Sequence, residues 1–541
     1  MAHTVAPSGD EAVLVGDAFE APPPLAPVCH EAYCYEMGVL LRFKIFSVLA
    51  VVSAAVVGPM VACGSDSASG AGDAGASDAT LADAPVDRGS QEDGSPESGP
   101  GDAALADGSD SGSDADAFAG DGGIVCTGEA GTLDPSFGDG GMVWLKYSGA
   151  QAFSVAVQVD GKILVGGATQ AGFALVRLLP DGSGDPSFGT NGLITTLVGE
   201  SIPAGYTALA IQPADGKIVA VGATGLLTGT RSLDFGVVRY FPGGGLDPTF
   251  GDGGAVATDF GSTDDYPQSV GLLADGRILV GGQNEINAVA STGNYVLARY
   301  QVDGTLDTTF GTGGKVTIDV HGTEDTPGVV ALVPGGKIVI AGTSARTTSL
   351  SSTAFDISAV QLNADGTLDT SFADAGKLVT NFGPDRQQAY AINVDRSGRV
   401  ILGGRYIGAA PQGFVVVRLT ASGALDPTFG DGGVVTTAFR AGADDVASSV
   451  LVQDDGKLLA TGISTVGSST TNIALTRYLP NGMLDLGFGT EGRSLTPPPP
   501  NADLAAAGAA MSGCTFITVA TWGYDNGTVP KNAMGIARYR R

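Results

Sequence analysis

From residue 133 to the end, the chain is built of short apolar runs separated by polar turns. Runs at 433–439, 448–453, 457–460 and 473–478 follow one another in a representative stretch. Their alternating and β-branched composition predicts β-strands, because an amphipathic helix needs a longer segment with a different period. Asp455-Gly456 separates two of the runs. This dipeptide is favoured in two-residue hairpins because both positions accept a positive φ. The stretch therefore predicts four short strands.

The same stretch recurs seven times. A motif Leu-Asp-x-x-Phe-Gly, with small departures, marks each repeat at spacings between 51 and 62 residues. Its aromatic residues are Phe137, Phe188, Phe250, Phe310, Phe372, Phe429 and Phe488. Its acidic residues are Asp134, Asp185, Asp247, Asp307, Asp369, Asp426 and Asp485. Units too small to bury their own faces can pack around an axis.

The repeats therefore predict an all-β fold: a seven-bladed β-propeller of four-stranded antiparallel blades over residues 133–541. An open β-solenoid is the alternative, and it is disfavoured because solenoid repeats are usually shorter and need no hairpin in each unit. The connections between the first and second strands of a repeat and between its third and fourth strands should emerge on one face of the propeller. Hairpins of the Asp-Gly type and the junctions between blades should emerge on the other.

Three features of the repeat occur together: Leu-Asp-x-x-Phe-Gly, Asp-Gly-Lys-Ile, and a fourth strand that ends in Arg followed by Tyr or Leu. In these features the chain resembles the delta-60 repeat family, whose members form β-propellers and are frequent in secreted proteins of deltaproteobacteria such as myxobacteria. The resemblance covers residues 133–541. It implies the fold and no particular activity, because the family is defined by its repeat.

The amino-terminal part carries an export pattern. Residues 37–62 combine a positive head, Arg42 and Lys44, with an apolar stretch at 45–57, which is typical of a signal peptide. They end in Met-Val-Ala before Cys63, which resembles the lipobox of bacterial lipoproteins and implies lipid attachment at Cys63. Bacterial lipoproteins prefer Leu at the position where this chain has Met60. The alternative is therefore a signal anchor that is not cleaved. An aspartate after the lipid-bearing cysteine is similar to a signal for retention in the inner membrane, and this chain has Gly64 there. We therefore expect the protein to be located in the outer membrane or at the cell surface.

Two flanking segments have no core-forming pattern. Residues 1–36 are acidic and rich in proline, a poor context ahead of a signal peptide, and we expect them to be untranslated or disordered. Residues 63–132 consist mainly of Gly, Ala, Ser and Asp, with Arg88 as the one basic residue. This composition cannot bury enough apolar surface to fold and predicts a disordered tether.

Cys126 and Cys514 lie at the two ends of the repeat array. Ring closure brings the first and last repeats together, and export permits oxidation, so we expect a disulfide between them. Two unrelated thiols are the alternative.

Charge and residue types narrow the function. The formal net charge of −29 argues against nucleic acid, whose binding depends on clustered Lys and Arg. His321 is the one histidine beyond residue 63, and neither a nucleophile-elbow motif nor a metal-ligand motif accompanies it. We therefore expect no catalytic residues and no cofactor beyond weakly held calcium. The arginines of the fourth strands (Arg177, Arg239, Arg299, Arg418, Arg477 and Arg538, with Gln361 in the remaining repeat) should contact the aspartates of the motif.

Function should reside where the repeats differ, and the first and third connections differ most in length and content. Candidate binding residues there are Tyr206, Asp264, Asp265, Tyr266, Glu324, Asp325, Asp385, Asp444 and Asp445. The acidic pairs among them could weakly hold calcium, and a solvated rim of loops is the equally weighted alternative.

The sequence thus predicts an exported, lipid-anchored β-propeller, non-enzymatic and monomeric, that recognises an extracellular protein or glycan and meets the membrane only through its lipid. A hydrolase or lyase of extracellular polymers, acting through carboxylates, is the first alternative. A passive component of the cell envelope is the second.

Overall fold

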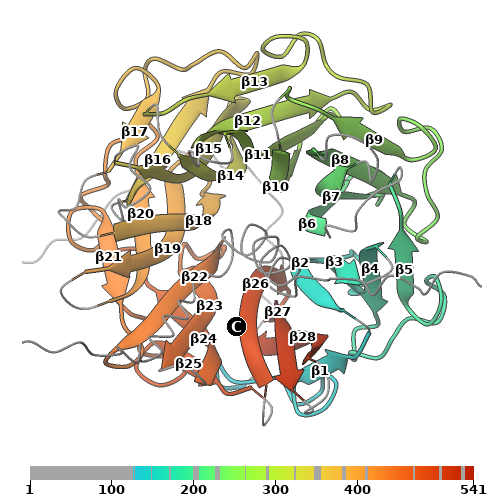
Figure 1. Ribbon diagram of the computed structural model, residues 1–541. Helices are drawn as coiled ribbons and strands as arrows, with labels where there is room; N and C mark the ends of the chain where they lie inside the picture. The colour runs from blue at the N-terminus through green and yellow to red at the C-terminus, as the bar shows by residue number, and fades with distance from the viewer. Residues whose placement is uncertain are drawn as a thin grey trace, which may run out of the picture. The chain divides into compact units, whose positions relative to one another are not determined.

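The computed structural model forms seven four-stranded antiparallel sheets arranged around an axis, so the predicted all-β seven-bladed propeller is confirmed (Figure 1). Within the described residues no helix has the length and apolar character needed to cross a membrane. The structure describes residues 126 and 128–541 except 148, 170–171, 199–205, 226–231, 262–263, 288–291, 322–323, 347–354, 381–385, 409–411, 467–469, 499–501 and 526–529. The expected segments 1–36 and 37–62, and nearly all of the tether, lie outside these residues.

Blades 1 to 7 each run from an inner strand beside the axis to an outer strand (Figure 1). The inner strands are β2 (Gln151–Val157), β6 (Tyr206–Ile211), β10 (Asp264–Leu272), β14 (Asp325–Val333), β18 (Arg386–Val394), β22 (Ala443–Val452) and β26 (Ala502–Ser512). The second strands are β3 (Ile163–Thr169), β7 (Ile218–Gly225), β11 (Ile278–Asn287), β15 (Lys337–Ala345), β19 (Val400–Ile407), β23 (Leu458–Val466) and β27 (Thr515–Asp525).

The third strands are β4 (Gly172–Leu178), β8 (Leu233–Tyr240), β12 (Thr292–Tyr300), β16 (Phe355–Leu362), β20 (Gly413–Leu419), β24 (Thr470–Tyr478) and β28 (Pro530–Arg540). The outer strands of blades 1 to 6 are β5 (Leu193–Thr196), β9 (Ala255–Thr258), β13 (Lys315–Ile318), β17 (Lys377–Val379), β21 (Val434–Thr437) and β25 (Arg493–Thr496). The outer strand of blade 7 is β1 (Met142–Leu145), which comes from the beginning of the array.

Each sequence repeat is divided between two blades. The repeat that begins at residue 433 gives its first strand, β21, to the outer edge of blade 5, and its other three strands build blade 6. The Leu-Asp-x-x-Phe-Gly motif consequently joins the third and outer strands of one blade. Sequence periodicity fixes the spacing of strands, whereas the partner of a short edge strand is chosen by the packing of the ring.

The core is a series of layers between neighbouring blades. β3 and β4 are buried along their whole length, because both faces of each sheet are covered by adjacent sheets. One apolar cluster joins Val339 and Ala341 of blade 4 to Leu402 and Val415 of blade 5. All seven phenylalanines of the motif are fully buried. Each blade therefore depends on its neighbours for its stability.

The predicted contacts between the repeated arginines and aspartates are present, and they also link successive blades. In six blades the arginine Nε donates to the aspartate Oδ2 at 2.7–2.8 Å. The guanidinium carbon lies 4.3–4.8 Å from the centroid of the motif phenylalanine. The Nη1 of Arg177 donates to the carbonyl of Pro242 in blade 2 at 2.6 Å, and that of Arg239 to Val302 in blade 3 at 2.5 Å. We call this arrangement the arginine latch.

Blade 4 departs from the latch. Gln361 replaces the arginine and is buried, and the motif aspartate, Asp369, instead accepts a hydrogen bond from Lys337 Nζ at 2.6 Å. In blades 1, 2 and 6 the equivalent lysine is a second cation beside the aspartate, 3.2–3.3 Å away. The lysine therefore suffices to neutralise the aspartate when the arginine is missing.

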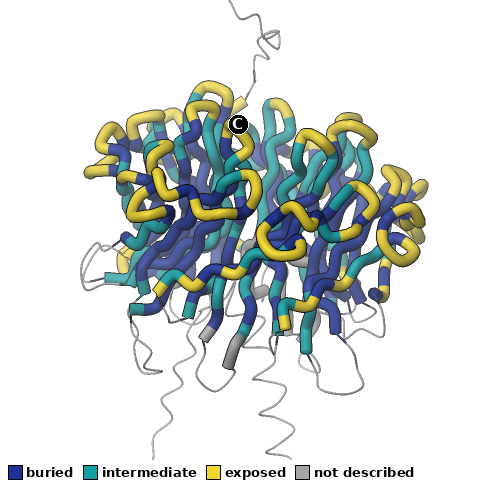
Figure 2. Tube along the Cα trace, turned by 90° about the horizontal axis from the view of Figure 1, so that it is seen from above, coloured by how far each residue is buried: buried dark blue, intermediate teal, exposed yellow. Residues whose placement is uncertain are grey.

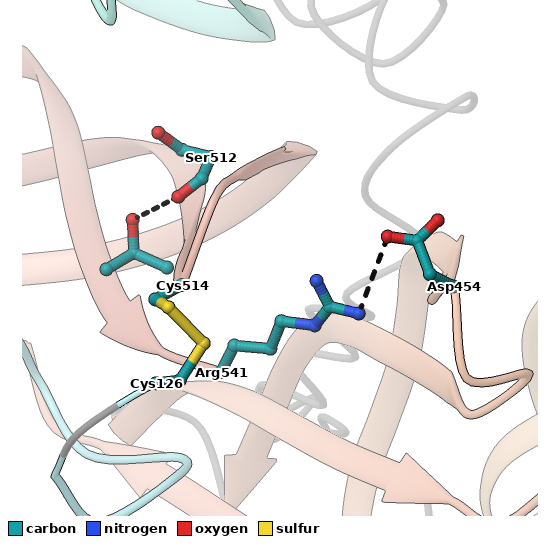
Figure 3. The surroundings of a disulfide bond; sticks show 6 residues. Cys126, Asp454, Ser512, Cys514 and Arg541 are labelled. Atoms are coloured by element: carbon teal, nitrogen blue, oxygen red, sulfur yellow. Dashed lines mark hydrogen bonds and ion pairs between the residues drawn. A yellow bond between two sulfur atoms is a disulfide. The ribbon is translucent and has the colours of Figure 1, made fainter. Parts of the chain in front are cut away.

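The ring closes through the residues that precede the first blade. Arg538 of β28 donates to Asp134 Oδ2 at 2.8 Å, and the Gly489 amide donates to the Ala130 carbonyl at 2.8 Å. A disulfide joins Cys126 to Cys514 in the hairpin between β26 and β27, across 388 residues of sequence (Figure 3). Hydrogen bonds, an ion pair and a covalent bond thus hold the two ends of the array together.

We expect loss of one latch to destabilise the whole ring. Asp247→Ala leaves the buried Arg239 without its carboxylate, which should cost about 3–5 kcal/mol of unfolding free energy. Asp454→Ala is the control, because Asp454 is an exposed partner of Arg396 and should change the unfolding free energy by less than about 0.5 kcal/mol. Urea unfolding followed by circular dichroism measures both. Equal effects of the two substitutions would contradict the latch.

The same aspartate predicts acid sensitivity. Burial alone would raise the pKa of Asp247, but hydrogen bonds from Thr249 and Lys217 and the charge of Arg239 lower it from 3.8 to about 2. A lowered pKa in the folded state means that the stabilisation is complete above pH 4 and is lost as the pH falls toward 2. In Asp247→Ala the decline in unfolding free energy over this range should be shallower than in the wild type.

Removal of the disulfide should weaken ring closure. The double substitution Cys126→Ser and Cys514→Ser frees the ends of a very long loop, and we expect a loss of about 3–5 kcal/mol. Unfolding of the oxidised wild type, the reduced wild type and the double variant measures this. The reduced wild type and the variant should agree. If the oxidised wild type unfolds at the same denaturant concentration as the double variant, the disulfide contributes nothing to the stability of the fold.

Candidate functional site

The propeller has two unlike rims. Hairpins between inner and second strands, together with the Leu-Asp-x-x-Phe-Gly turns, form one rim, which carries many exposed residues in Figure 2. We call it the hairpin rim. Crossovers from each outer strand to the next inner strand, together with the connections between second and third strands, lie at the opposite ends of the strands and form the loop rim. The loop rim carries the predicted binding residues.

Three of those residues are interior. Asp265, Asp325 and Asp445 are at most 1% exposed, so they are not surface groups as the sequence suggested. Their Oδ2 atoms accept backbone hydrogen bonds at 2.7–2.9 Å from Phe260, Val320 and Phe439, respectively. The crossover amides need acceptors where the strand ladder ends, and these carboxylates supply them. Their repetition reflects the construction of the crossover.

Asp325 belongs to a buried polar chain. Ser344 Oγ donates to Asp325 Oδ1 and lies 3.1 Å from Ser358 Oγ, which is 2.6 Å from the Tyr295 hydroxyl. Burial raises the pKa of Asp325 to about 6, although the Ser344 hydrogen bond opposes the shift. His321 is exposed. This row of hydrogen-bonded side chains satisfies buried polar atoms inside blades 3 and 4.

The other predicted residues are distributed along the rim. Asp264 accepts hydrogen bonds at Oδ1 from the Leu233 amide (3.0 Å) and at Oδ2 from the Tyr266 hydroxyl (3.1 Å). Glu324 is half-buried just before β14. The Asp444 side chain is 32% exposed and lies 3.4 Å from Arg405 Nη1. Asp385 and the side chain of Tyr206 lie outside the described residues, as does Cys63.

One group of carboxylates on the loop rim has the composition of a cation site. Carboxylate oxygens of Asp234, Asp259 and Asp265, from β8, the β9–β10 crossover and β10, lie within 4.8 Å of one another. Burial raises the pKa of Asp234, and the charges of Asp259 and Asp264 raise it further. Oxygen-rich groups of this kind are the ligands that calcium prefers.

A neighbouring lysine offsets part of this charge. Lys315 Nζ donates to the backbone carbonyl of Asp259 at 2.5 Å, and its charge lowers the pKa of Asp234. The charge of Lys315 would therefore weaken calcium binding at the three carboxylates. The sequence-based expectation concerned the acidic pairs in general, and of this group it named Asp265 but not Asp234 or Asp259 as a candidate binding residue. Asp234 lies within β8, and most other repeats have no acidic residue at that position, so the sequence offered no repeated signal for it.

The sequence comparison identifies the repeat. Six segments match a family model described as "Domain of unknown function (DUF5122) beta-propeller": residues 158–188, 214–250, 273–310, 334–372, 396–429 and 453–488. Each segment runs from the first hairpin of a blade to the phenylalanine of the latch. No curated protein matches the chain in sequence.

Solved structures with similar folds include several propellers. Virginiamycin B lyase from Staphylococcus aureus is 10% identical, with a TM-score of 0.39 over 73% of this chain and 98% of that one. A polysaccharide lyase described as a PL25 ulvanlyase bound to -[GlcA(1-4)Rha3S]- is 10% identical, with a TM-score of 0.44 over 74% and 95%. Sqt1 from Chaetomium thermophilum is 14% identical, with a TM-score of 0.38 over 70% and 83%. These likenesses transfer no activity.

The acidic group makes a prediction about cations. Asp234→Asn removes one of three crowded carboxylates, so without divalent cations the variant should be more stable than the wild type. Millimolar calcium should raise the melting temperature of the wild type and leave that of the variant nearly unchanged. Asp303→Asn, at a turn of the hairpin rim, is the control and should respond to calcium as the wild type does. Equal calcium responses of wild type and Asp234→Asn would exclude binding at this group.

Proposed function

Because this chain carries DUF5122 β-propeller repeats, we propose that it is an exported, lipid-anchored and non-enzymatic binding protein that recognises an extracellular protein or glycan through its loop rim. Residues 37–62, with their lipobox-like end at Cys63, and the resemblance to delta-60 repeats support export. The disulfide also supports it, since structural disulfides persist in oxidising compartments.

The position of Cys126 carries the proposal. Cys126 is bonded to the β26–β27 hairpin, so the chain that leads back to Cys63 joins the propeller at the hairpin rim. In a protein anchored through Cys63 the tether would then meet the propeller at the hairpin rim and leave the loop rim free of the point of attachment. The loop rim is also where the blades differ most in side-chain chemistry. Attachment and recognition would thus use opposite rims.

Fractionation of the native envelope tests the anchor. The wild type should sediment with membranes and carry an acylated Cys63, whereas Cys63→Ser should not be acylated. Cys126→Ser, the control, should remain in the membrane fraction because it keeps the acylated residue. An unacylated wild type would refute the anchor.

Two orientations of the mature protein test the recognition surface. Val159 on the hairpin rim and Leu197 on the loop rim are both exposed apolar residues, 109% and 65% exposed. The Val159→Cys variant and the Leu197→Cys variant are each immobilised through the new thiol. Each is then incubated with extracellular polysaccharides and secreted proteins from the native culture. Ligand capture should be strong for Val159→Cys and weak for Leu197→Cys. Equal capture would refute recognition by the loop rim, and cleavage of a polymer would favour the hydrolase or lyase alternative.

A further inference from the structure

The charges at the loop-rim end of blade 5 are opposite to those of its neighbours. Strand register makes three positions equivalent among blades 3 to 6: two at the start of the inner strand and one on the second strand. Blades 3, 4 and 6 hold two carboxylates and one neutral side chain there: Asp264, Asp265 and Gln283; Glu324, Asp325 and Thr343; Asp444, Asp445 and Ile463. Blade 5 holds Arg386, Gln387 and Arg405.

Arg405 is an unusual residue at its position. Its side chain is 2% exposed, and its Nε donates to Gln388 Oε1 at 2.8 Å. In blade 4 the equivalent Thr343 makes a simple contact with the next blade, accepting a hydrogen bond from the Ala389 amide at 3.2 Å. A threonine is therefore sufficient for packing at this position, and a buried guanidinium carries a cost in desolvation that packing does not require.

The carboxylate that faces Arg405 is held loosely. Asp444 of blade 6 lies 3.4–3.5 Å from Arg405 Nη1, whereas the latch arginines contact their aspartates at 2.7–2.8 Å. Asp444 is also 32% exposed, so the pair reaches solvent on the Asp444 side. A contact of this length is a weak hydrogen bond. Another carboxylate could therefore displace Asp444 at modest cost.

Further cations surround this pair. Arg386 is half-buried close to Arg405, and both burial and the charge of Arg405 lower the pKa of Arg386. Arg440 is exposed in the β21–β22 crossover near Asp445. Guanidinium groups bind planar carboxylates through two parallel N–H donors. The local positive charge therefore suits an incoming carboxylate.

We propose that Arg386 and Arg405, with Asp444 at their edge, form a subsite for the carboxylate of a uronate residue in an extracellular polysaccharide. The proposal rests on recognition by the loop rim and specifies its ligand. Tyr390, on the inner strand that carries Arg386, is half-buried, and Arg405 hydrogen-bonds to the Tyr390 hydroxyl. An aromatic face beside an arginine fits a sugar ring with a carboxylate better than it fits a run of acidic side chains.

Titration calorimetry of the mature chain with tetragalacturonate at low ionic strength tests this subsite. The wild type should bind the acidic oligosaccharide and not its neutral counterpart, tetragalactose. Arg386→Gln should weaken binding at least tenfold. Arg396→Gln, which removes an 85% exposed arginine elsewhere, should leave the affinity unchanged. Asp444→Asn should tighten binding several-fold, because it removes the competing carboxylate.

The outcomes separate this inference from the broader proposal. Arg405→Gln should also weaken binding tenfold, but if it fails to fold, the half-buried Arg386 and the opposite effect at Asp444 decide the question. Three results would each overturn the uronate subsite. The wild type does not bind tetragalacturonate, Arg386→Gln and Arg396→Gln bind it with equal affinity, or the wild type binds a sulfated neutral oligosaccharide as well as it binds tetragalacturonate. Continued capture by the Val159→Cys protein in those cases would leave loop-rim recognition intact.

Discussion

A buried guanidinium near the end of the third strand organises this propeller. It binds the aspartate of its own Leu-Asp-x-x-Phe-Gly turn, lies over the phenylalanine of that turn and donates to a carbonyl of the following blade, as Arg239 does toward Asp247, Phe250 and Val302. Few other groups can make all three contacts, because they require a planar cation with several donors in fixed directions. The motif repeats because most interfaces between blades use this set of contacts, whereas in blade 4 Lys337 takes the place of the arginine beside Asp369.

Because five of the six latches reach forward into the next blade, the two ends of the array must meet for the set to be complete. Asp134, from the first repeat, meets Arg538 in the last blade, and β1 supplies that blade with its outer strand. The Cys126–Cys514 bond covers the same seam. The cysteines lie at the one blade whose strands come from both ends of the array. The covalent bond therefore acts where conformational entropy opposes the fold most strongly.

The two rims respond differently to this constraint. The hairpin rim contains the latch turns, so its residues repeat closely from blade to blade. The loop rim needs only an acceptor for each crossover amide, which Asp265, Asp325 and Asp445 supply from the interior. Other positions on that rim are free to diverge. The charge at these positions differs between blades. Carboxylates cluster around Asp234, whereas guanidinium groups cluster around Arg405.

The sequence alone determined the number of blades, the four-strand unit and the latch partners, because each follows from a local motif or from its period. It could not assign the edge strands, since a strand as short as β21 pairs where the ring places it. Nor could it separate the buried Asp265 from the partly exposed Asp264 beside it, because adjacent residues of a strand face opposite sides. Only the packing of neighbouring blades decides which of those sides is interior, and only that packing brings Asp234 to Asp265 and Arg405 to Asp444.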